Sequence, residues 1–153
     1  MLERSKISFM NLALQEAKKA ITLGEVPVGA VLVLKGDVIA RAHNLVEQEN
    51  DPTAHAEMVV IREGSRKLGT PRLPECDLYV TLEPCPMCAQ ALSFARIRQV
   101  IFGAYDPKGG GIDHGPHIYA HKTAMHKPAV IGGIEETKCK ELLKTFFQSL
   151  RVP

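Results

Sequence analysis

The chain has 153 residues, a net charge of +2 and an ordinary globular balance of 45% hydrophobic and 24% charged residues. This length suits one core, so we expect residues 1–153 to form a single domain. Apolar runs such as Val28–Leu34 are too short to span a membrane, and no apolar segment typical of a signal peptide follows the N-terminal charges. We therefore expect a cytoplasmic protein with no membrane partner. The charge is too small to indicate nucleic-acid binding by itself.

The apolar pattern and the turn residues predict helices and strands along the whole chain. Ser5 and Gly24 are expected to begin and end the first helix, and Asp51 or Thr53 to cap the second. In chain order, the predicted elements are a helix at 5–23, strands at 28–34 and 38–42 around a tight turn, a helix at 54–68, a strand at 78–82, a helix at 84–95, strands at 100–102 and 130–132, and a helix at 135–150. Residues 44–52 and 106–128 are expected to be loops.

Strands that alternate with helices are typical of a mainly parallel sheet with helices on both faces. The opening hairpin adds an antiparallel pair, which makes the predicted sheet mixed. We therefore predict an α/β fold of three layers, α/β/α, around a mixed five-stranded sheet.

Two short segments carry residues suited to metal chemistry. The first is Thr53-Ala54-His55-Ala56-Glu57, and the second is Glu83-Pro84-Cys85-Pro86-Met87-Cys88. Each opens a predicted helix after a strand or its loop, and ligand sites of open α/β sheets lie at such junctions. The positive end of a helix also favours the thiolate form of a cysteine, which is the form that binds metal.

His55, Cys85 and Cys88 are predicted to hold one zinc ion. An imidazole and two thiolates are good zinc ligands, and three protein ligands leave a fourth position open, as in catalytic sites. Zinc at such a site activates water near neutral pH. Glu57 is predicted to be the general acid–base, because a carboxylate beside the metal can take a proton from water and return it to a leaving amine.

Two other interpretations of the cysteines are less favoured. A closed structural zinc site would use Cys76 or Cys139 as a fourth ligand, but it would need neither Glu57 nor helix starts. A redox Cys-x-x-Cys pair would explain neither His55 nor Glu57. Cys76 and Cys139 are instead predicted to be small buried residues.

His-Ala-Glu followed by Pro-Cys-x-x-Cys resembles the signature of the cytidine/deoxycytidylate deaminase superfamily, whose zinc chemistry is well described. Within it, the chain resembles the bacterial tRNA-specific adenosine deaminases over nearly its whole length. The matching segments include 27–31, 50–57, 81–85, 102–104 and 146–147. The resemblance implies a cytidine-deaminase-like fold, a homodimer, and conversion of adenosine to inosine at the wobble position, 34, of a tRNA anticodon stem-loop.

The resemblance also implies substrate contacts. Asn44 would contact the flipped base, Val28 would line its pocket, and the main chain of Ala56 would touch it. Asp106 would contact the ribose of a flanking nucleotide. Phe146 and Phe147 would wall the anticodon channel; because adjacent residues cannot share one helix face, one of the two is predicted to lie in the core.

Several alternatives remain open at the level of sequence. A small-molecule deaminase, such as guanine deaminase, shares the same motifs, and a non-catalytic RNA-binding subunit could keep the zinc site. Between Gly109 and Val130 the chain departs from the family pattern. This segment carries His114, His117, His121 and His126, which we expect to form an exposed polar loop rather than a second metal site. The expected dimer is supported by an apolar face at Met87, Ala91, Leu92 and Ala95.

Overall fold

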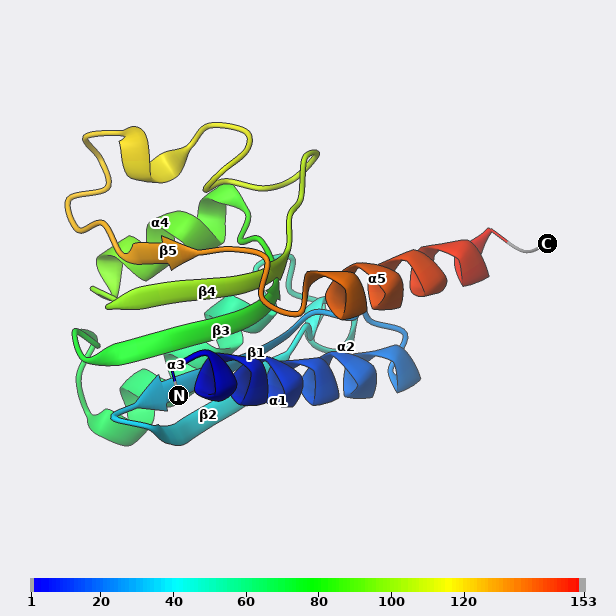
Figure 1. The fold of residues 1–153 in the computed structure, drawn as a ribbon, viewed down its shortest axis with the longest axis horizontal. Coiled ribbons are helices and arrows are strands. Elements are labelled where there is room, and N and C mark those ends of the chain that lie inside the picture. The colour runs from blue at the N-terminus through cyan, green and yellow to red at the C-terminus, as the bar shows by residue number, and fades with distance from the viewer. Residues whose placement is uncertain (1, 152–153) are drawn as a thin grey trace.

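The structure is a computed structural model that describes residues 2–151, with the side chain of Leu2 excepted. Its elements are α1 (Leu2–Thr22), β1 (Gly29–Leu34), β2 (Asp37–His43), α2 (Val46–Glu49), α3 (Ala56–Leu68), β3 (Cys76–Leu82), α4 (Pro86–Phe94), β4 (Gln99–Ala104), the 3₁₀ helix η1 (Ile118–Ala120), β5 (Ala129–Ile131) and α5 (Glu136–Leu150). Figure 1 shows them in chain order. Every predicted helix and strand is present, with boundaries shifted by a few residues.

The five strands form one mixed sheet in the order β2-β1-β3-β4-β5. The β3–β4 and β4–β5 pairs are parallel, whereas β1 is antiparallel to both β2 and β3. The prediction of a mixed sheet is confirmed: β2, β3, β4 and β5 run in one direction and β1 runs against them. Two of the four strand pairs are therefore antiparallel, rather than the hairpin pair alone. The reason is the crossover through α3: it makes β2 and β3 run the same way, and β1, the partner of β2 in the hairpin, lies between them.

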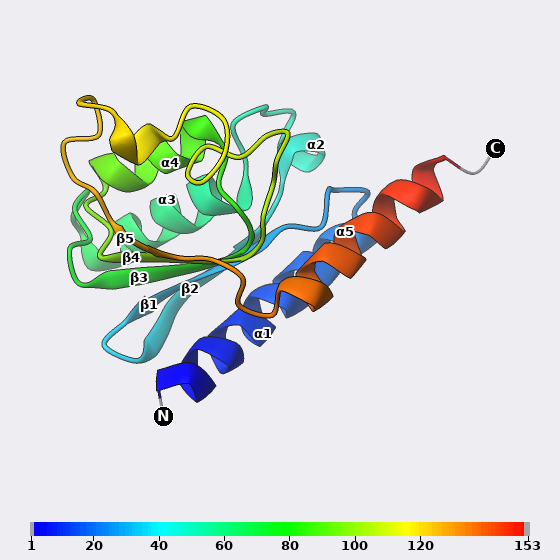
Figure 2. The same ribbon diagram turned by 45° about the horizontal axis from the view of Figure 1, so that its top comes forward.

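Helices cover both faces of the sheet, as predicted for a three-layer fold. Figure 2 shows α1 and α5 on one side and α3 and α4 on the other. Successive strand residues point to opposite faces, so Leu32 packs with α3 and α4, while Val31 packs with α1. Leu92 and Ala95 belong to the first of these cores, so they are not part of an exposed apolar face.

The first helix begins earlier than its predicted cap. Ser5 lies inside α1, so it does not cap the helix, whereas Gly24 ends it with φ +72° as expected. Gly29 then lets β1 approach the helix closely, because a Cβ there would lie 2.0 Å from the carbonyl oxygen of Ala13. This direct contact between the backbones of α1 and β1 fixes the position of the start of β1.

Two short helices were not predicted. Periodicity cannot reveal helices of three or four residues, and α2 depends instead on a distant side chain. The carboxylate of Glu25, which is buried, accepts hydrogen bonds from the main-chain N–H groups of Glu47 at 3.1 Å and Gln48 at 2.8 Å. This acidic cap holds the start of α2.

The edge strand β2 contains a bulge. Leu32 pairs with Ala40 and Val33 with Val38, so Ile39 has no partner in the register. The Lys67 ammonium donates a hydrogen bond of 2.8 Å to the carbonyl oxygen of Ile39. Over residues 2–151, no helix has the length and apolar character needed to cross a membrane.

Candidate active site

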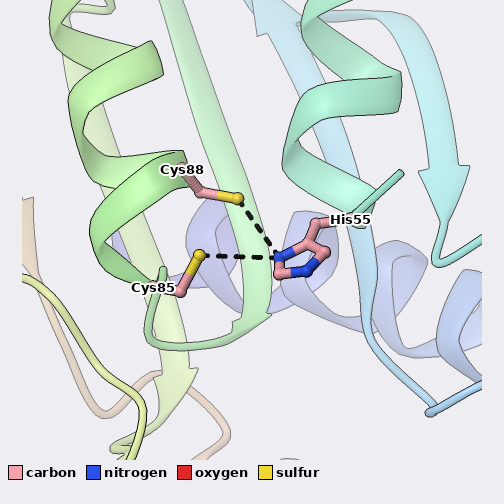
Figure 3. Close-up of side chains that lie close together, drawn as sticks. All are labelled: His55, Cys85 and Cys88. Atoms are coloured by element: carbon pink, nitrogen blue, oxygen red, sulfur yellow. Dashed lines mark hydrogen bonds between the residues drawn. The ribbon is translucent and has the colours of Figure 1, made fainter. Parts of the chain in front are cut away.

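His55, Cys85 and Cys88 lie together at the N-terminal ends of α3 and α4. The Nδ1 atom of His55 is 3.5 Å from the Sγ atom of each cysteine, and the three ligand atoms all lie within 4.8 Å of one another (Figure 3). Zinc bonds of about 2.3 Å to sulfur and about 2.0 Å to nitrogen at tetrahedral angles place such atoms roughly 3.5 Å apart. The donor set and its spacing therefore fit one zinc ion.

Both helices present their N-cap residue to this cluster. His55 (φ −68°, ψ 152°) precedes α3 and Cys85 (φ −69°, ψ 170°) precedes α4, and neither side chain caps its own helix. Pro86 occupies the first turn of α4, as predicted. The extended backbone of an N-cap residue turns its side chain toward the helix end. The pair His55 and Glu57, two residues apart, and the pair Cys85 and Cys88, three residues apart, can therefore meet at one point.

The cluster favours at least one thiolate before any metal binds. A hydrogen bond from the Cys88 thiol, helped by His55 and opposed by burial, lowers the pKa of Cys85 to about 4. The same hydrogen bond, together with burial, raises the pKa of Cys88. Binding of a metal to both sulfurs therefore requires release of the Cys88 proton.

Glu57 lies in the first turn of α3, beside the ligands. Its side chain is 4% exposed and lines the cavity, and it interacts with the Cys88 thiol. Burial raises the pKa of the Glu57 carboxyl to about 7. A carboxyl with that pKa can exchange protons near neutrality, which is what a general acid–base must do.

The cluster opens into a cavity of ≈ 1090 Å³ between α5, the loop at 105–109 and the segments around residues 25 and 45. All but two of the predicted site residues line it, namely Val28, Asn44, His55, Glu57, Cys85, Asp106, Phe146 and Phe147. The exceptions, Ala56 and Cys88, are fully buried beneath the surface. The fold thus gathers residues from six separate segments of the chain around one concave surface.

Asn44 has a structural task that the sequence did not reveal. Its Oδ1 atom accepts a hydrogen bond of 2.8 Å from the main-chain N–H of Ala56, the first residue of α3. Neither Asp51 nor Thr53 caps this helix; Asp51 instead accepts hydrogen bonds from the N–H and hydroxyl of Thr53. Asn44 therefore orients the helix start that carries His55 and Glu57, and its Nδ2 donor is the amide group left for a ligand.

Phe146 and Phe147 both contribute to the cavity, so the prediction that one of them lies in the core is wrong. Phe147 is 44% exposed and Phe146 is half-buried, with ring centroids 5.4 Å apart. Figure 1 shows why: the C-terminal part of α5 extends past the ends of the strands, where no sheet lies beneath it.

Comparison with known proteins identifies the family. Residues 3–104 match the model of the cytidine and deoxycytidylate deaminase zinc-binding region. The tRNA-specific adenosine deaminase of Agrobacterium fabrum is 53% identical, with 94% of this chain and 95% of that protein covered. The protein of the same name from Bacillus subtilis is 50% identical, with 94% and 89% covered. The chain belongs to the tRNA-specific adenosine deaminase family.

A solved structure supports the same assignment. It comes from a study of A-to-I editing by tRNA:A34 deaminases, has a TM-score of 0.88 and 54% sequence identity, and covers 89% of this chain and 99% of that chain. The cytidine-deaminase-like fold is therefore confirmed. In this zinc-binding deaminase domain, His55, Cys85 and Cys88 are positioned to bind one metal ion, and among residues 2–151 they alone form a group able to do so.

The structure also tests the predictions for the two other cysteines and for the histidine-rich loop. Cys76 and Cys139 are free, buried and outside the cluster, so the closed four-ligand site is excluded. Among the described residues, the loop histidines belong to no cluster that could hold a metal, and the loop is not simply an exposed polar loop. His114 is half-buried against Glu83, and His126 is half-buried and bonded through Nε2 to the carbonyl oxygen of Ile97 at 2.7 Å.

The loop backbone also packs directly on the zinc-ligand segment. A Cβ at Gly111 would lie 2.5 Å from the main-chain nitrogen of Pro86, so we expect Gly111→Ala to destabilise the protein by about 1–3 kcal/mol and to weaken zinc binding. Thermal unfolding and zinc content measure both effects. Gly109→Ala is the matched control, because its Cβ meets only the end of the Asp106 side chain at 3.0 Å. Equal effects of the two variants would contradict the prediction.

Proposed function

We propose that this chain hydrolytically deaminates adenosine to inosine at the wobble position, 34, of tRNA. The observation that carries the proposal is the single cavity that joins the zinc-binding set and Glu57 to Asn44, Asp106 and the two phenylalanines. A cavity of ≈ 1090 Å³ is at the upper end of small-molecule sites, which favours a base together with its neighbours over a free base. The names of the similar proteins agree with this substrate.

The chemistry assigned to each residue follows from its position. Water adds to C6 of the adenine ring, the bond from C6 to the exocyclic nitrogen breaks, and ammonia leaves. Zinc, when bound, supplies a Lewis acid that activates water at neutral pH. Glu57 takes a proton from the attacking water and delivers it to the leaving amine.

The other residues bind and orient the base and its neighbours. We propose that Nδ2 of Asn44 donates to an acceptor of the base and that Val28 packs against the ring. The contact expected from the main chain of Ala56 remains a prediction, since the N–H of Ala56 is bonded to Asn44. Asp106 is assigned to a flanking ribose, and Phe146 and Phe147 to stacking with flanking bases.

The test is direct. The purified protein is incubated with an anticodon stem-loop carrying A34 and, separately, with free guanine, and the products are quantified. Inosine in the RNA supports the proposal; turnover of guanine without turnover of the RNA identifies a small-molecule deaminase instead. Binding of the RNA without any turnover would indicate a non-catalytic subunit, which the presence of Glu57 disfavours.

Because tRNA is the substrate, the proposal also places this single-domain enzyme in the cytoplasm.

We also propose a homodimer. Phe94, at the end of α4, is 72% exposed, and Met125 is 84% exposed on the adjoining loop. Ser93, the residue before Phe94, donates a hydrogen bond to the carbonyl oxygen of His126, the residue after Met125, so the end of α4 and this loop pack together. Such exposed apolar side chains are typical of association surfaces.

We therefore expect light scattering at micromolar concentration to give twice the chain mass for the wild type and the chain mass for Phe94→Lys. Leu68→Lys is a control, because Leu68 is 39% exposed at the end of α3, outside the proposed contact. A monomeric wild type, or a dimer unaffected by Phe94→Lys, would refute this surface.

A further inference from the structure

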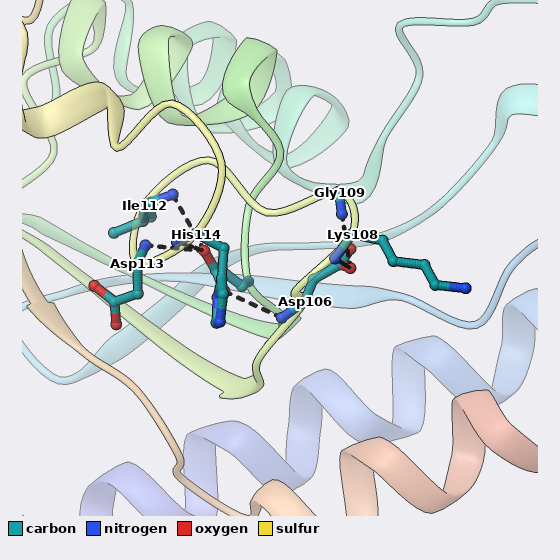
Figure 4. Close-up of polar contacts among 7 residues, drawn as sticks. Asp106, Lys108, Gly109, Ile112, Asp113 and His114 are labelled. Atoms are coloured by element: carbon teal, nitrogen blue, oxygen red, sulfur yellow. Dashed lines mark hydrogen bonds and ion pairs between the residues drawn. The ribbon is translucent and has the colours of Figure 1, made fainter.

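Glu83, the residue after β3, binds a whole loop through its carboxylate. It is 2% exposed, and its Oε1 accepts hydrogen bonds from the N–H of Asp106 at 3.1 Å and from Nδ1 of His114 at 2.8 Å. Its Oε2 accepts from the N–H groups of Ile112 at 3.2 Å, Asp113 at 2.9 Å and His114 at 3.1 Å. Figure 4 shows these partners converging from both ends of the loop.

The glycines of this loop fit the same contact. A Cβ at Gly110 would lie 2.4 Å from Oε2 of Glu83, so only a glycine lets the backbone close on the carboxylate. The N–H of Gly111 donates to the carbonyl oxygen of Pro84 at 2.8 Å, between Glu83 and Cys85. The segment that carries two zinc ligands and the loop at 106–114 are therefore joined by one buried side chain and by main-chain packing around it.

Asp106 is set by this arrangement. Its N–H is held by Glu83, and its Oδ1 accepts from the N–H groups of Lys108 at 3.2 Å and Gly109 at 2.9 Å. The loop turn is thus fixed at both the main chain and one carboxylate oxygen, while Asp106 still lines the cavity. Glu83 contacts the loop and lies two residues before the ligand Cys85 in the chain. The position of Asp106 relative to Cys85 therefore depends on Glu83.

We propose that Glu83 is a positioning residue for substrate binding: it fixes the loop at 106–114 so that Asp106 meets the RNA at a set distance from the zinc site. The proposal rests on the proposed function, because it assigns the RNA contact to Asp106. Glutamate is required rather than glutamine, because both carboxylate oxygens accept hydrogen bonds. In glutamine, an NH₂ group would replace one of these oxygens. At the Oε2 position it would face three main-chain N–H donors, and at the Oε1 position it would face the ring N–H of His114 and one main-chain N–H.

The test is a double-mutant cycle of Glu83→Gln and Asp106→Asn, with the dissociation constant of the A34 stem-loop measured in a Glu57→Ala background and kcat and KM in the active enzyme. Each single variant is expected to weaken binding roughly tenfold, the loss typical of one charge-assisted hydrogen bond. The double variant is expected to bind the stem-loop as tightly as whichever single variant binds it less tightly, because both substitutions act on the same contact between Asp106 and the RNA. KM should rise by a similar factor with kcat changed less than threefold and zinc content unchanged.

Glu16→Gln is the matched control. Glu16 is likewise buried, at 4% exposed, but it pairs with Lys19 and Arg41 on the opposite face of the sheet. It should lose stability without weakening RNA binding. The proposal is overturned if Glu83→Gln weakens binding no more than Glu16→Gln, or if the effects of Glu83→Gln and Asp106→Asn are additive.

A second pair of variants decides the matter if Glu83→Gln does not fold or loses zinc. His114→Phe keeps a ring but removes the donor to Glu83, whereas His114→Asn keeps a donor. His114→Phe should raise KM and couple to Asp106→Asn, and His114→Asn should not; equal behaviour of the two overturns the proposal.

Amide hydrogen exchange separates this proposal from the proposed function. If the wild type proves inactive on RNA, the proposed function fails. The positioning role is then judged by exchange at Ile112, Asp113 and His114. Faster exchange at these amides in Glu83→Gln or His114→Phe but not in Glu16→Gln supports the role, and unchanged exchange overturns it.

Discussion

Glu57→Ala is expected to lower kcat by about 10²–10⁴-fold, the contribution typical of a positioned general acid–base. The zinc content should stay at one ion per subunit, because His55, Cys85 and Cys88 supply the ligands and Glu57 only adjoins them. Single-turnover assays on the A34 stem-loop, with zinc quantified on the same sample, measure both quantities. Glu57→Gln, which keeps the size of the side chain, should be impaired to a similar degree.

Glu63→Ala on the same helix is the matched control. Glu63 forms exposed ion pairs with Arg66 and Lys67 and does not line the cavity. Surface pairs of this kind contribute little, so the activity of that variant should match the wild type. Turnover by Glu57→Ala within tenfold of the wild type would show that another group moves the proton.

Cys88→Ala should abolish zinc binding and, with it, activity. Only two of the three ligands remain, so the tetrahedral set cannot form. Zinc at 1,000 times its dissociation constant stabilises a folded protein by about 4 kcal/mol. A chelator should therefore lower the melting temperature of the wild type but leave that of Cys88→Ala unchanged.

The control for this variant is Cys139→Ala. Cys139 is buried to the same degree, at 1% exposed, but it packs under β4 on the other face of the sheet, away from the ligands. It should keep its zinc and its response to the chelator while losing some packing energy. Metal retained at wild-type affinity in Cys88→Ala would contradict the assignment of the ligands.

The zinc-binding set and the order of elements could be predicted from sequence because their signals are local. The spacing His55-x-Glu57 and the pair Cys85-x-x-Cys88 each lie within one helix start, and apolar periodicity marks the strands and long helices. The direction of β1 relative to β3 could not be predicted in this way, because pairing is decided by which strands meet after the chain folds. The second antiparallel pair, β1 with β3, was not predicted for that reason.

The supporting roles of Asn44 and Glu83 were missed because the partners of these side chains are distant in the chain. Asn44 caps a helix that begins 12 residues later, and Glu83 binds a loop whose residues lie 23 to 31 positions away. Neither leaves a periodic or cap-like trace beside the residue itself. An acidic residue directly after an apolar strand, as Glu83 is, was the only available signal, and it predicts burial with a partner rather than the identity of that partner.

The bulge at Ile39 has a consequence for how copies of this chain can meet. Unpaired strand edges invite other chains to add strands and aggregate. At one edge of the sheet, the bulge distorts β2 and Lys67 occupies the carbonyl of Ile39; at the other, β5 is only three residues long. Both edges therefore resist continuous pairing between sheets. Self-association without fibre growth is left to the helical and loop surfaces.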